Sequence, residues 1–446
     1  MIYSNHLSLK EGLKSKKFRK YLKILICIIC ILIPLIGFDF SVKADTTLNF
    51  EPGNLPFHNP TPGRITIMAS TPIPSTIHPT RRAYEDLVDC GFNLCTFSGD
   101  EEYIKQQFAL AEGLDLKLLI KNLTLYTDQY KKIVDRYRNY PSFGGWNFYD
   151  EPTYAKLDEI KRLYERLHNY DPDNLIFINL IGMKIDLYTG PSKDMTQYLN
   201  LIQKMFHPAL WSYDLYPFYQ YGKDVKLRCD QFFQALEVYS EMAKKTSRPF
   251  WAYCQSMAFK TKSLQRPVAK EEYLRFTNFS FLAYGAQGIL YWTYGQRPST
   301  DDETYISALV DLNGKKTKAW YAAQKVNREI IKFNDVFYGC DVSEVKHTGK
   351  THYEGTTQLK GKFGPFESVI TEDVGALFSR LSSNGKEYVV IVNHDVNKVQ
   401  KIKLTLAPNQ KVKRLTDNKK ATQTGNTLQF QLEKGGWAIF EIGESV

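Results

Sequence analysis

The chain has 446 residues, of which 14% are aromatic, and a formal net charge of +10. A chain of this length has room for a large domain followed by a smaller one. Residues 1–44 hold eight Lys or Arg against two Asp or Glu, a net +6, so the remainder carries only +4. We expect no nucleic-acid partner, because the basic balance lies in the leader and no basic patch remains elsewhere.

The N-terminal leader combines a lysine-rich start, an apolar run over residues 24–38 and a small residue, Ala44, at a suitable cleavage point. This order is typical of a secretory signal peptide. We predict that residues 1–44 are removed and that the protein is exported from a bacterial cell, to the periplasm or outside it. An uncleaved anchor, which would bring membrane contact, is the alternative. Pro34 and Gly37 interrupt the run and favour cleavage.

The cysteines and histidines give no sign of a disulfide framework or a metal centre. Two of the seven cysteines lie in the leader, and the other five are widely and irregularly spaced. An odd number at such spacings does not build a disulfide scaffold, so we predict buried thiols. The histidines lack metal-ligand spacing, and we expect no metal and no other cofactor.

Short strand-like runs alternate with longer stretches whose apolar residues recur every three or four positions. Strand followed by helix, eight times over, is the pattern of a (β/α)8 barrel. We therefore predict an α/β fold whose barrel occupies residues 45–336. The eight predicted strands are Arg64–Ser70, Asn93–Phe97, Leu116–Lys121, Phe143–Tyr149, Asn174–Leu180, Leu210–Asp214, Pro249–Gln255 and Gly288–Tyr294.

Beyond Asn334 the pattern changes to alternating strands and tight turns. Residues 376–381 and 387–392 alternate on either side of Asn384-Gly385, which is a strong hairpin signal. Further runs at 401–406, 428–432 and 437–442 complete the pattern. Residues 337–446 are predicted to form an antiparallel β-sandwich.

The fourth predicted strand carries the most informative stretch of the chain. Phe143–Pro152 begins as a buried strand, then stops on two acids, Asp150 and Glu151, and a proline that cannot continue the ladder. In an α/β barrel the carboxyl ends of the strands surround the active site. A helix cap is the alternative for either acid. A cap needs only one acid and does not need Trp146 and Tyr149 just upstream.

The ends of the other predicted strands add aromatic and amide side chains to the same rim. Aromatic rings can cover the apolar faces of a sugar, and amides can bond its hydroxyls, so a carbohydrate partner is expected. The predicted substrate-binding residues are Trp146, Tyr149, Asn122, Asn179, Tyr216, Trp251, Tyr253, Gln255, Tyr291 and Trp292.

The motif Asp150-Glu151-Pro152 resembles the Asn/Asp-Glu-Pro signature of the retaining (β/α)8 glycoside hydrolases, which include β-galactosidases and cellulases. Residues 214–217, Asp-Leu-Tyr-Pro, and 282–292, which run into strand eight, are also similar to members of that group. The resemblance covers about residues 55–335. It implies that Glu151 is the general acid/base.

Strand seven departs from this resemblance, because it ends on Gln255 where that group carries a nucleophilic glutamate. Glutamine cannot form a glycosyl-enzyme. The second carboxylate is then expected from another strand, with Asp214 as the first choice and the acids at 100–102 or 301–303 behind it. A gap of about 5–5.5 Å to Glu151 would imply retention, and about 6.5–9.5 Å inversion.

The sequence therefore predicts an exported glycoside hydrolase that acts on a poly- or oligosaccharide. Glu151 would be the general acid, Asp214 its ionised partner and Asp150 a further acid of the site. A carbohydrate-binding barrel that has lost catalysis is the first alternative, and a structural or protein-binding barrel is the second. Asp214 also has a purely structural interpretation, as a strand-end acid that holds a neighbouring side chain.

Overall fold

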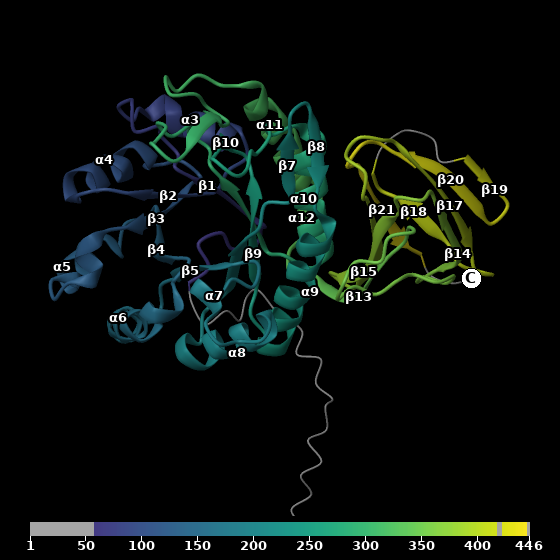
Figure 1. Cartoon of the computed structure of the whole chain (residues 1–446), viewed down its shortest axis with the longest axis horizontal. Helices are drawn as coiled ribbons and strands as arrows, with labels where there is room; N and C mark the ends of the chain where they lie inside the picture. Colours follow the sequence, from purple (N-terminus) through teal and green to yellow (C-terminus); the bar gives the residue numbers. More distant parts are fainter. Residues whose placement is uncertain (1–57, 417–421, 444–446) are drawn as a thin grey trace, which may run out of the picture. The chain divides into compact units, whose positions relative to one another are not determined.

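The computed structural model describes residues 58–416 and 422–443 (Figure 1). The predicted signal peptide lies outside these residues. Within them, no helix is long and apolar enough to cross a membrane.

Eight parallel strands form a closed barrel, in the spatial order β1-β11-β9-β6-β5-β4-β3-β2. This confirms the predicted (β/α)8 barrel. All eight predicted strands are present, with ends that differ by one or two residues. Their bounds are β1 Thr66–Ser70, β2 Leu94–Ser98, β3 Lys117–Lys121, β4 Phe143–Asp150, β5 Ile176–Ile181, β6 Trp211–Asp214, β9 Phe250–Gln255 and β11 Gly288–Trp292.

Helices cover the outside of the barrel, as the periodicity predicts. Helix α6 is representative, because Leu157, Ile160, Tyr164 and Leu167 recur every three or four residues and are all buried. The longer helices are α3 Arg81–Asp89, α4 Glu101–Ala111, α5 Tyr130–Tyr137, α6 Leu157–Tyr170, α8 Met195–Phe206, α9 Cys229–Thr246, α10 Glu271–Ala283 and α11 Lys318–Lys332. The short ones are η3 Leu123–Tyr126, η4 Tyr154–Lys156, α7 Asp186–Thr189 and α12 Asn334–Phe337.

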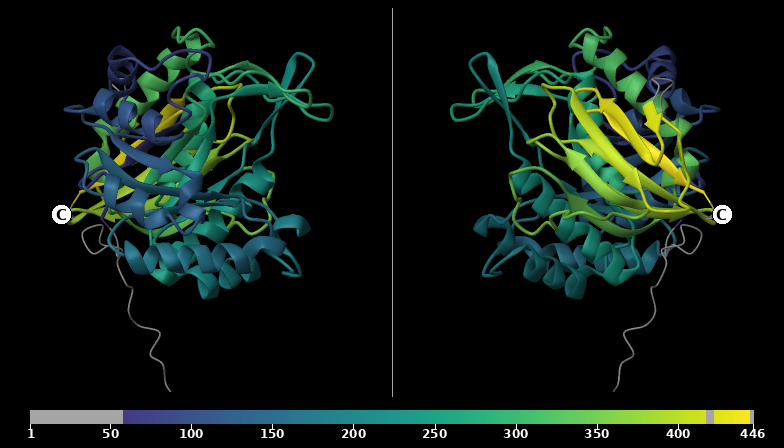
Figure 2. Two further views of the ribbon diagram at one scale, coloured as in Figure 1. Left: turned by 90° about the vertical axis from the view of Figure 1, so that its left-hand side faces the viewer. Right: turned by 90° about the vertical axis from the view of Figure 1, so that its right-hand side faces the viewer.

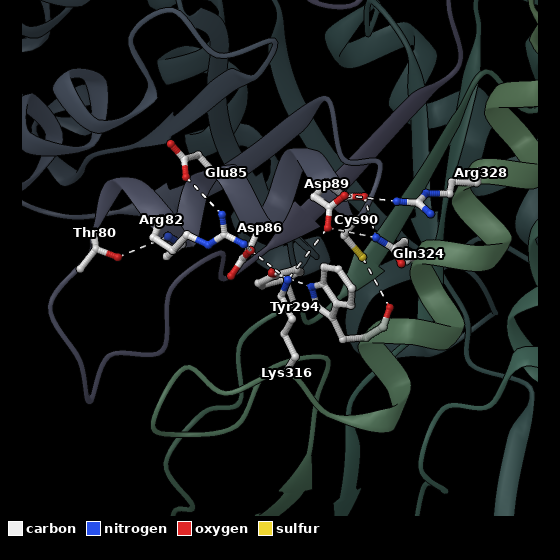
Figure 3. A network of polar contacts seen from close by, with 12 residues as sticks. Thr80, Arg82, Glu85, Asp86, Asp89, Cys90, Tyr294, Lys316, Gln324 and Arg328 are labelled. Atoms are coloured by element: carbon white, nitrogen blue, oxygen red, sulfur yellow. Dashed lines mark hydrogen bonds and ion pairs between the residues drawn. The ribbon is translucent and has the colours of Figure 1, made fainter.

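Polar contacts connect the first and last of the long barrel helices (Figure 3). Lys316, just before α11, lies 2.9 Å from the carboxylate of Asp86 on α3. Arg328 on α11 contacts Asp89 at 3.2 Å, and the side-chain amide of Gln324 donates to the same residue. Exposed pairs of this kind contribute little singly, but here they span the place where β11 closes on β1.

The barrel interior is filled by side chains and is not a channel. Met68, Leu94, Leu119, Leu175 and Leu290 meet there with further inward-facing residues, all of them buried. Alternate residues of each strand point inward, so the last inward residue of each strand lies at the carboxyl-end rim. That rim is where the sequence placed the site.

Two short antiparallel strand pairs lie outside the barrel sheet and were not predicted. Strands β7 Phe218–Tyr221 and β8 Asp224–Leu227 pair after β6, and β10 Ala258–Lys260 pairs with β12 Thr304–Ser307. Their strands are only three or four residues long. Such short runs carry too little periodicity to separate them from loop sequence.

The C-terminal domain is an antiparallel β-sandwich, as predicted, with sheets in the order β13-β15-β16-β21-β18 and β14-β17-β20-β19. The right-hand view of Figure 2 shows its long strands side by side. At the predicted hairpin turn both Asn384 and Gly385 have positive φ, 51° and 74°. The strands are β13 Asp341–His347, β14 Phe366–Thr371, β15 Ala376–Ser383, β16 Lys386–Asn393, β17 Gln400–Leu406, β18 Val412–Arg414, β19 Thr422–Thr424, β20 Thr427–Leu432 and β21 Trp437–Ile442.

The five cysteines outside the leader are buried free thiols, which confirms that prediction. Burial raises the pKa of the Cys95 and Cys254 thiols, so these groups remain protonated.

Candidate active site

A cavity of about 800 Å³ opens at the carboxyl end of the barrel. Strands β1, β2, β3, β4, β5, β6, β9 and β11 all contribute to its lining, together with the loop after β11. Its carboxylates are Asp100, Asp150, Glu151, Asp214 and Glu303. A larger hollow of about 1190 Å³ lies between α10, α11 and the sandwich. Lys and Glu side chains line much of it, and we place the chemistry at the rim where the barrel's acids converge.

The local structure of β4 directs Glu151 toward the cavity. Gly145 has φ 127°, and a Cβ there would lie 2.5 Å from the carbonyl oxygen of Leu175, so the close approach of β4 to its neighbour requires glycine. A bulge follows between Asn147 and Tyr149. Glu151 itself has φ 44°, an uncommon conformation for a residue with a side chain. Its backbone N–H donates to the carbonyl of Asn179 at 2.9 Å, which fixes the turn.

Glu151 and Asp214 share a hydrogen bond between their carboxyl groups. The side-chain amide of Asn179 donates to Asp214 Oδ1 at 2.9 Å and to Asp150 Oδ1 at 3.2 Å. Ser212 Oγ in turn donates to Asn179 Oδ1 at 2.8 Å, which orients the amide. One amide thus holds Asp150 and Asp214, and Asp214 in turn bonds Glu151.

The pKa values of both paired carboxyl groups are raised. Burial is the largest cause of the raised pKa of Glu151. The hydrogen bond with Asp214 lowers this pKa, and the charge of Asp150 raises it. The pKa of Asp214 is raised well above its usual range, first by burial and then by the charges of Glu151 and Asp150. Two carboxylates in contact cannot both ionise readily, so the pair retains a proton.

This arrangement differs from the ionised role that the sequence assigned to Asp214. The pKa values of both groups are raised, so the two carboxyl groups share a proton and Asp214 is not a separate ionised group. The two groups are also in direct contact, closer than the separations of about 5–5.5 Å or 6.5–9.5 Å that the sequence argument required. In this arrangement Asp214 is a partner of Glu151 and does not stand opposite it.

Aromatic side chains form one wall of the cavity. Trp292 and Tyr216 stack with their ring centroids 5.6 Å apart and their planes at 25°. Tyr253 lies nearby, and the hydroxyl of Ser70 donates to its phenol oxygen at 3.4 Å. Together with Asn179, these residues are the predicted substrate-binding side chains that line the cavity. A flat apolar wall beside amides and carboxyls suits a sugar ring.

Three predicted aromatic residues do not line the cavity. Trp146 is fully buried on the outer side of the barrel, where its indole N–H donates to Asp171 at 2.7 Å. Tyr291 also points outward and bonds Asn278 and Asn327. Trp251 faces inward but lies in the packed interior. A side chain lines the cavity only if it points inward and lies near the carboxyl end of its strand. The sequence argument did not apply these two conditions to the three residues.

Three further predicted residues are absent from the lining because they have structural roles. The side chain of Asn122 caps η3 and donates to the carbonyl of Gly99. Tyr149, beside the bulge, packs against Tyr126 with a centroid distance of 6.4 Å. Gln255 has the inward parity of β9, yet its amide donates to the carbonyl of Pro267, and its buried Oε1 has no hydrogen-bond partner among the described residues.

The sequence argument missed several residues that do line the cavity. Asn147 precedes the bulge on β4, and its amide donates to the hydroxyl of Thr96 at 2.6 Å. Lys121 ends β3, while Arg297 and Tyr305 come from the segment after β11. The inward parity of the strands could have indicated Asn147 and Lys121. No local signal marks Arg297 and Tyr305, because they reach the rim only when the segment after β11 folds over it.

No group of three or more His, Cys, Asp or Glu side chains among residues 58–416 and 422–443 is arranged to hold a metal ion.

Comparisons with known proteins agree with this fold. A family model described as β-galactosidase matches residues 152–333. A catalytic mutant of Gan42B, a GH42 β-galactosidase from G. stearothermophilus, aligns over 86% of this chain and 99% of its own, with 10% identity and a TM-score of 0.54. The β-galactosidase from Bacillus circulans sp. alkalophilus aligns over 85% and 99%, with 9% identity and a TM-score of 0.55.

A β-galactosidase from the psychrophilic Marinomonas ef1 aligns over 60% of each chain, with 11% identity and a TM-score of 0.45, so this chain spans less than two thirds of that protein. No curated protein matches the chain. At these identities the structural likeness establishes the fold, and site chemistry has to be argued from the residues. The matching family model and the closed barrel together confirm the resemblance to the (β/α)8-barrel glycoside hydrolases that was found in the sequence.

Proposed function

We propose that the protein hydrolyses a glycosidic bond of a poly- or oligosaccharide at the barrel mouth, with Glu151 as the general acid. The observation that carries this proposal is the carboxyl pair of Glu151 and Asp214, which retains a proton beside an aromatic wall. A general acid has to keep its proton near neutral pH, and burial beside another carboxyl group achieves this.

The proton passes from the pair to the leaving oxygen. Glu151 lies on the cavity lining and gives the shared proton to that oxygen as its bond to the anomeric carbon breaks. Both carboxyl groups are then ionised until a proton from water restores the pair. The pair loses one proton in total, and the leaving group departs as a neutral alcohol. During the transfer the side-chain amide of Asn179 holds Asp214, and its backbone carbonyl accepts the N–H of Glu151.

The sugar would lie against Trp292 and Tyr216, with its hydroxyls toward Asn179, Asn147 and Tyr253. Because the matching family and the aligned structures are described as β-galactosidases, β-galactosides are the first substrates to test. Aryl glycosides of other sugars and a glycan array extend the search.

The variant Glu151→Gln tests the role of the proton donor. Poor leaving groups need the proton and good ones do not, so natural linkages should be hydrolysed about 10²–10⁴-fold more slowly while activated aryl glycosides lose much less. The matched control is Glu159→Gln, an exposed acid on α6, which should hydrolyse both substrates at the wild-type rate. Equal rates for Glu151→Gln and wild type on a natural linkage would refute the assignment.

A carbohydrate-binding barrel without catalysis is the second candidate, and the absence of a glutamate at position 255 favours it. It predicts that the wild type binds saccharides on an array and cleaves none of them. In that case Trp292→Ala should abolish binding, whereas Glu151→Gln should leave it unchanged.

We also propose that the protein is exported after cleavage next to Ala44. The lysine-rich start and the apolar run support this proposal. Amino-terminal sequencing of secreted material should begin near Asp45. Recovery of the intact chain from the membrane would support the uncleaved anchor instead.

A further inference from the structure

The paired acids leave one requirement of glycoside hydrolysis unmet. Hydrolysis at an anomeric carbon uses a carboxylate on the side opposite the proton donor, either as nucleophile or as the base for a water. Asp214 is in contact with Glu151, and Gln255 has no carboxyl group. A different acid has to take that place.

The remaining carboxylates of the cavity can be compared by what already holds them. The side chain of Asp100 accepts a hydrogen bond from the backbone N–H of Tyr103 at 2.9 Å and caps helix α4. Asp150 is the chain neighbour of Glu151 and bonds the same amide of Asn179 that holds Asp214. Neither of these acids is independent of a structural role or of the proton donor's own cluster.

Glu303 is the cavity acid that comes from a separate element. It immediately precedes β12, in the segment between β11 and α11, and is half-buried at the cavity lining. Its neighbours Asp301 and Asp302 are exposed and do not line the cavity. One acid of this run therefore faces the cavity while two face solvent.

The carboxylate of Glu303 is held in position by the phenol of Tyr305, which donates a hydrogen bond to it. Tyr305 is buried, and its ring lies against Trp292 with a centroid distance of 6.3 Å and against Phe259 at 6.2 Å. The phenol thus connects the acid to the aromatic wall of the same cavity.

The backbone around Glu303 is anchored as well. Its N–H donates to the hydroxyl of Thr300 at 3.1 Å, and the N–H of Tyr305 donates to the hydroxyl of Ser299 at 3.0 Å. Strand β12 pairs with β10, which follows β9 closely in the chain. The segment that carries the acid is thereby joined to the strand whose end lacks one.

We propose that Glu303 is the second catalytic carboxylate of this glycoside hydrolase, an inference that rests on the proposed function. Its oxygen gives an electron pair to the anomeric carbon, directly or through a water whose proton it takes. The bond to the leaving oxygen breaks at the same time, and that oxygen takes the proton held by Glu151 and Asp214. On the direct route a water then displaces Glu303 from the anomeric carbon and gives its proton to the Glu151–Asp214 pair; on the water route the proton taken by Glu303 exchanges with solvent, which reprotonates the pair. The segment after β11 thus supplies the carboxylate that β9 lacks.

The variant Glu303→Gln tests this assignment. Because the carboxylate acts on the anomeric carbon whatever the leaving group, hydrolysis of natural and activated substrates should both fall about 10³-fold or more. This outcome separates Glu303 from Glu151, whose loss should spare activated substrates. Asp302→Asn, one residue away and exposed, is the matched control and should keep the wild-type rate. Thermal unfolding of each variant verifies that it is folded.

Chemical rescue gives a second, independent measurement. In Glu303→Gly the cavity gains room for an anion, and added azide should restore cleavage of an activated aryl glycoside and yield a glycosyl azide. Tyr305→Phe, which only positions the acid, should lower kcat about 10-fold with little change in KM. A Glu303→Gln variant that keeps at least a tenth of the wild-type rate overturns the assignment.

The two proposals fail in distinguishable ways. If Glu151→Gln loses natural linkages while Glu303→Gln keeps its rate, the proposed function stands and the role of Glu303 is refuted. If the wild-type protein cleaves no glycoside, both proposals fail together.

Discussion

Glu151 and Asp214 touch through their carboxyl groups although they lie at the ends of two strands, β4 and β6, that are not neighbours in the barrel. Asn179, on the intervening strand β5, contacts both, because its amide donates to Asp214 and its carbonyl accepts the backbone N–H of Glu151. The fold therefore places two acids where at least one proton has to remain. Such an arrangement costs stability at neutral pH and supplies a proton donor in return.

Asp214→Asn should stabilise the protein at neutral pH. The folded-state pKa of Asp214 is raised, so the stability it contributes is complete at pH below its unfolded pKa and is lost as pH rises toward the folded value. Asparagine does not titrate and can still donate to Glu151. At pH 7 the free energy of unfolding should rise by about 1–2 kcal/mol, and the gain should vanish below about pH 4. Urea unfolding at both pH values measures this difference, and a destabilised variant at pH 7 would contradict it.

The same variant should narrow the pH range of activity. With Asp214 gone, Glu151 alone holds the catalytic proton and loses it at lower pH than the pair does. The basic limb of kcat/KM against pH, measured on a poor leaving group, should move down by about one pH unit. An activated aryl glycoside is the internal control, since it needs little proton donation. An unmoved limb would show that Asp214 does not share the proton.

Trp292 and Trp146, both predicted to bind sugar, should respond in opposite ways to substitution. Trp292 lies in the cavity wall, so Trp292→Ala should raise KM about tenfold with little effect on folding. Trp146 is buried and donates to the carboxylate of Asp171. Trp146→Phe should lower the free energy of unfolding by about 1.5–3 kcal/mol and leave kcat/KM unchanged. Kinetics and urea unfolding of both variants form the comparison, and a large KM change in Trp146→Phe would contradict the structure.

The buried histidine pair at the edge of the sandwich should make the protein sensitive to acid. Nδ1 of His347 lies 3.1 Å from Nε2 of His394, and the phenol of Tyr284 contacts the first ring. Burial lowers the pKa of His394 to about 3 and that of His347 well below its usual value. The unfolded chain thus binds more protons below pH 6.5, so stability is lost as pH falls from about 6.5 toward 3.

The variant His394→Gln isolates this effect. The free energy of unfolding of the wild type should fall by about 1–2 kcal/mol between pH 7.5 and pH 5, and the variant should lose distinctly less. Glu237, which accepts a hydrogen bond from Tyr284, and the nearby His352 are the other titratable groups facing the pair's surroundings. Exposed His168 on α6 provides the control substitution. Identical pH slopes for wild type and variant would exclude the pair as the source.

The local sequence determined the barrel, the sandwich and the position of Glu151. The spacing of apolar residues depends on neighbouring positions in the chain. The eight strand-like runs and the change of spacing after Asn334 could therefore be recognised from the sequence. The acids before Pro152 had to fall at the carboxyl end of β4, because proline ends the ladder there. That single stretch is enough to predict the candidate site at the mouth of the barrel.

Only the tertiary structure decided which side chains meet. Trp146 and Trp292 have the same chemistry, yet strand parity and the bulge in β4 turn one to the core and leave the other in the cavity. The contact of Glu151 with Asp214 depends on how the barrel closes. The place of Glu303 over the rim depends on the pairing of β10 with β12, two short strands far apart in the chain. Such long-range contacts leave no periodic trace in the sequence, because they are set by how the barrel closes and not by neighbouring residues.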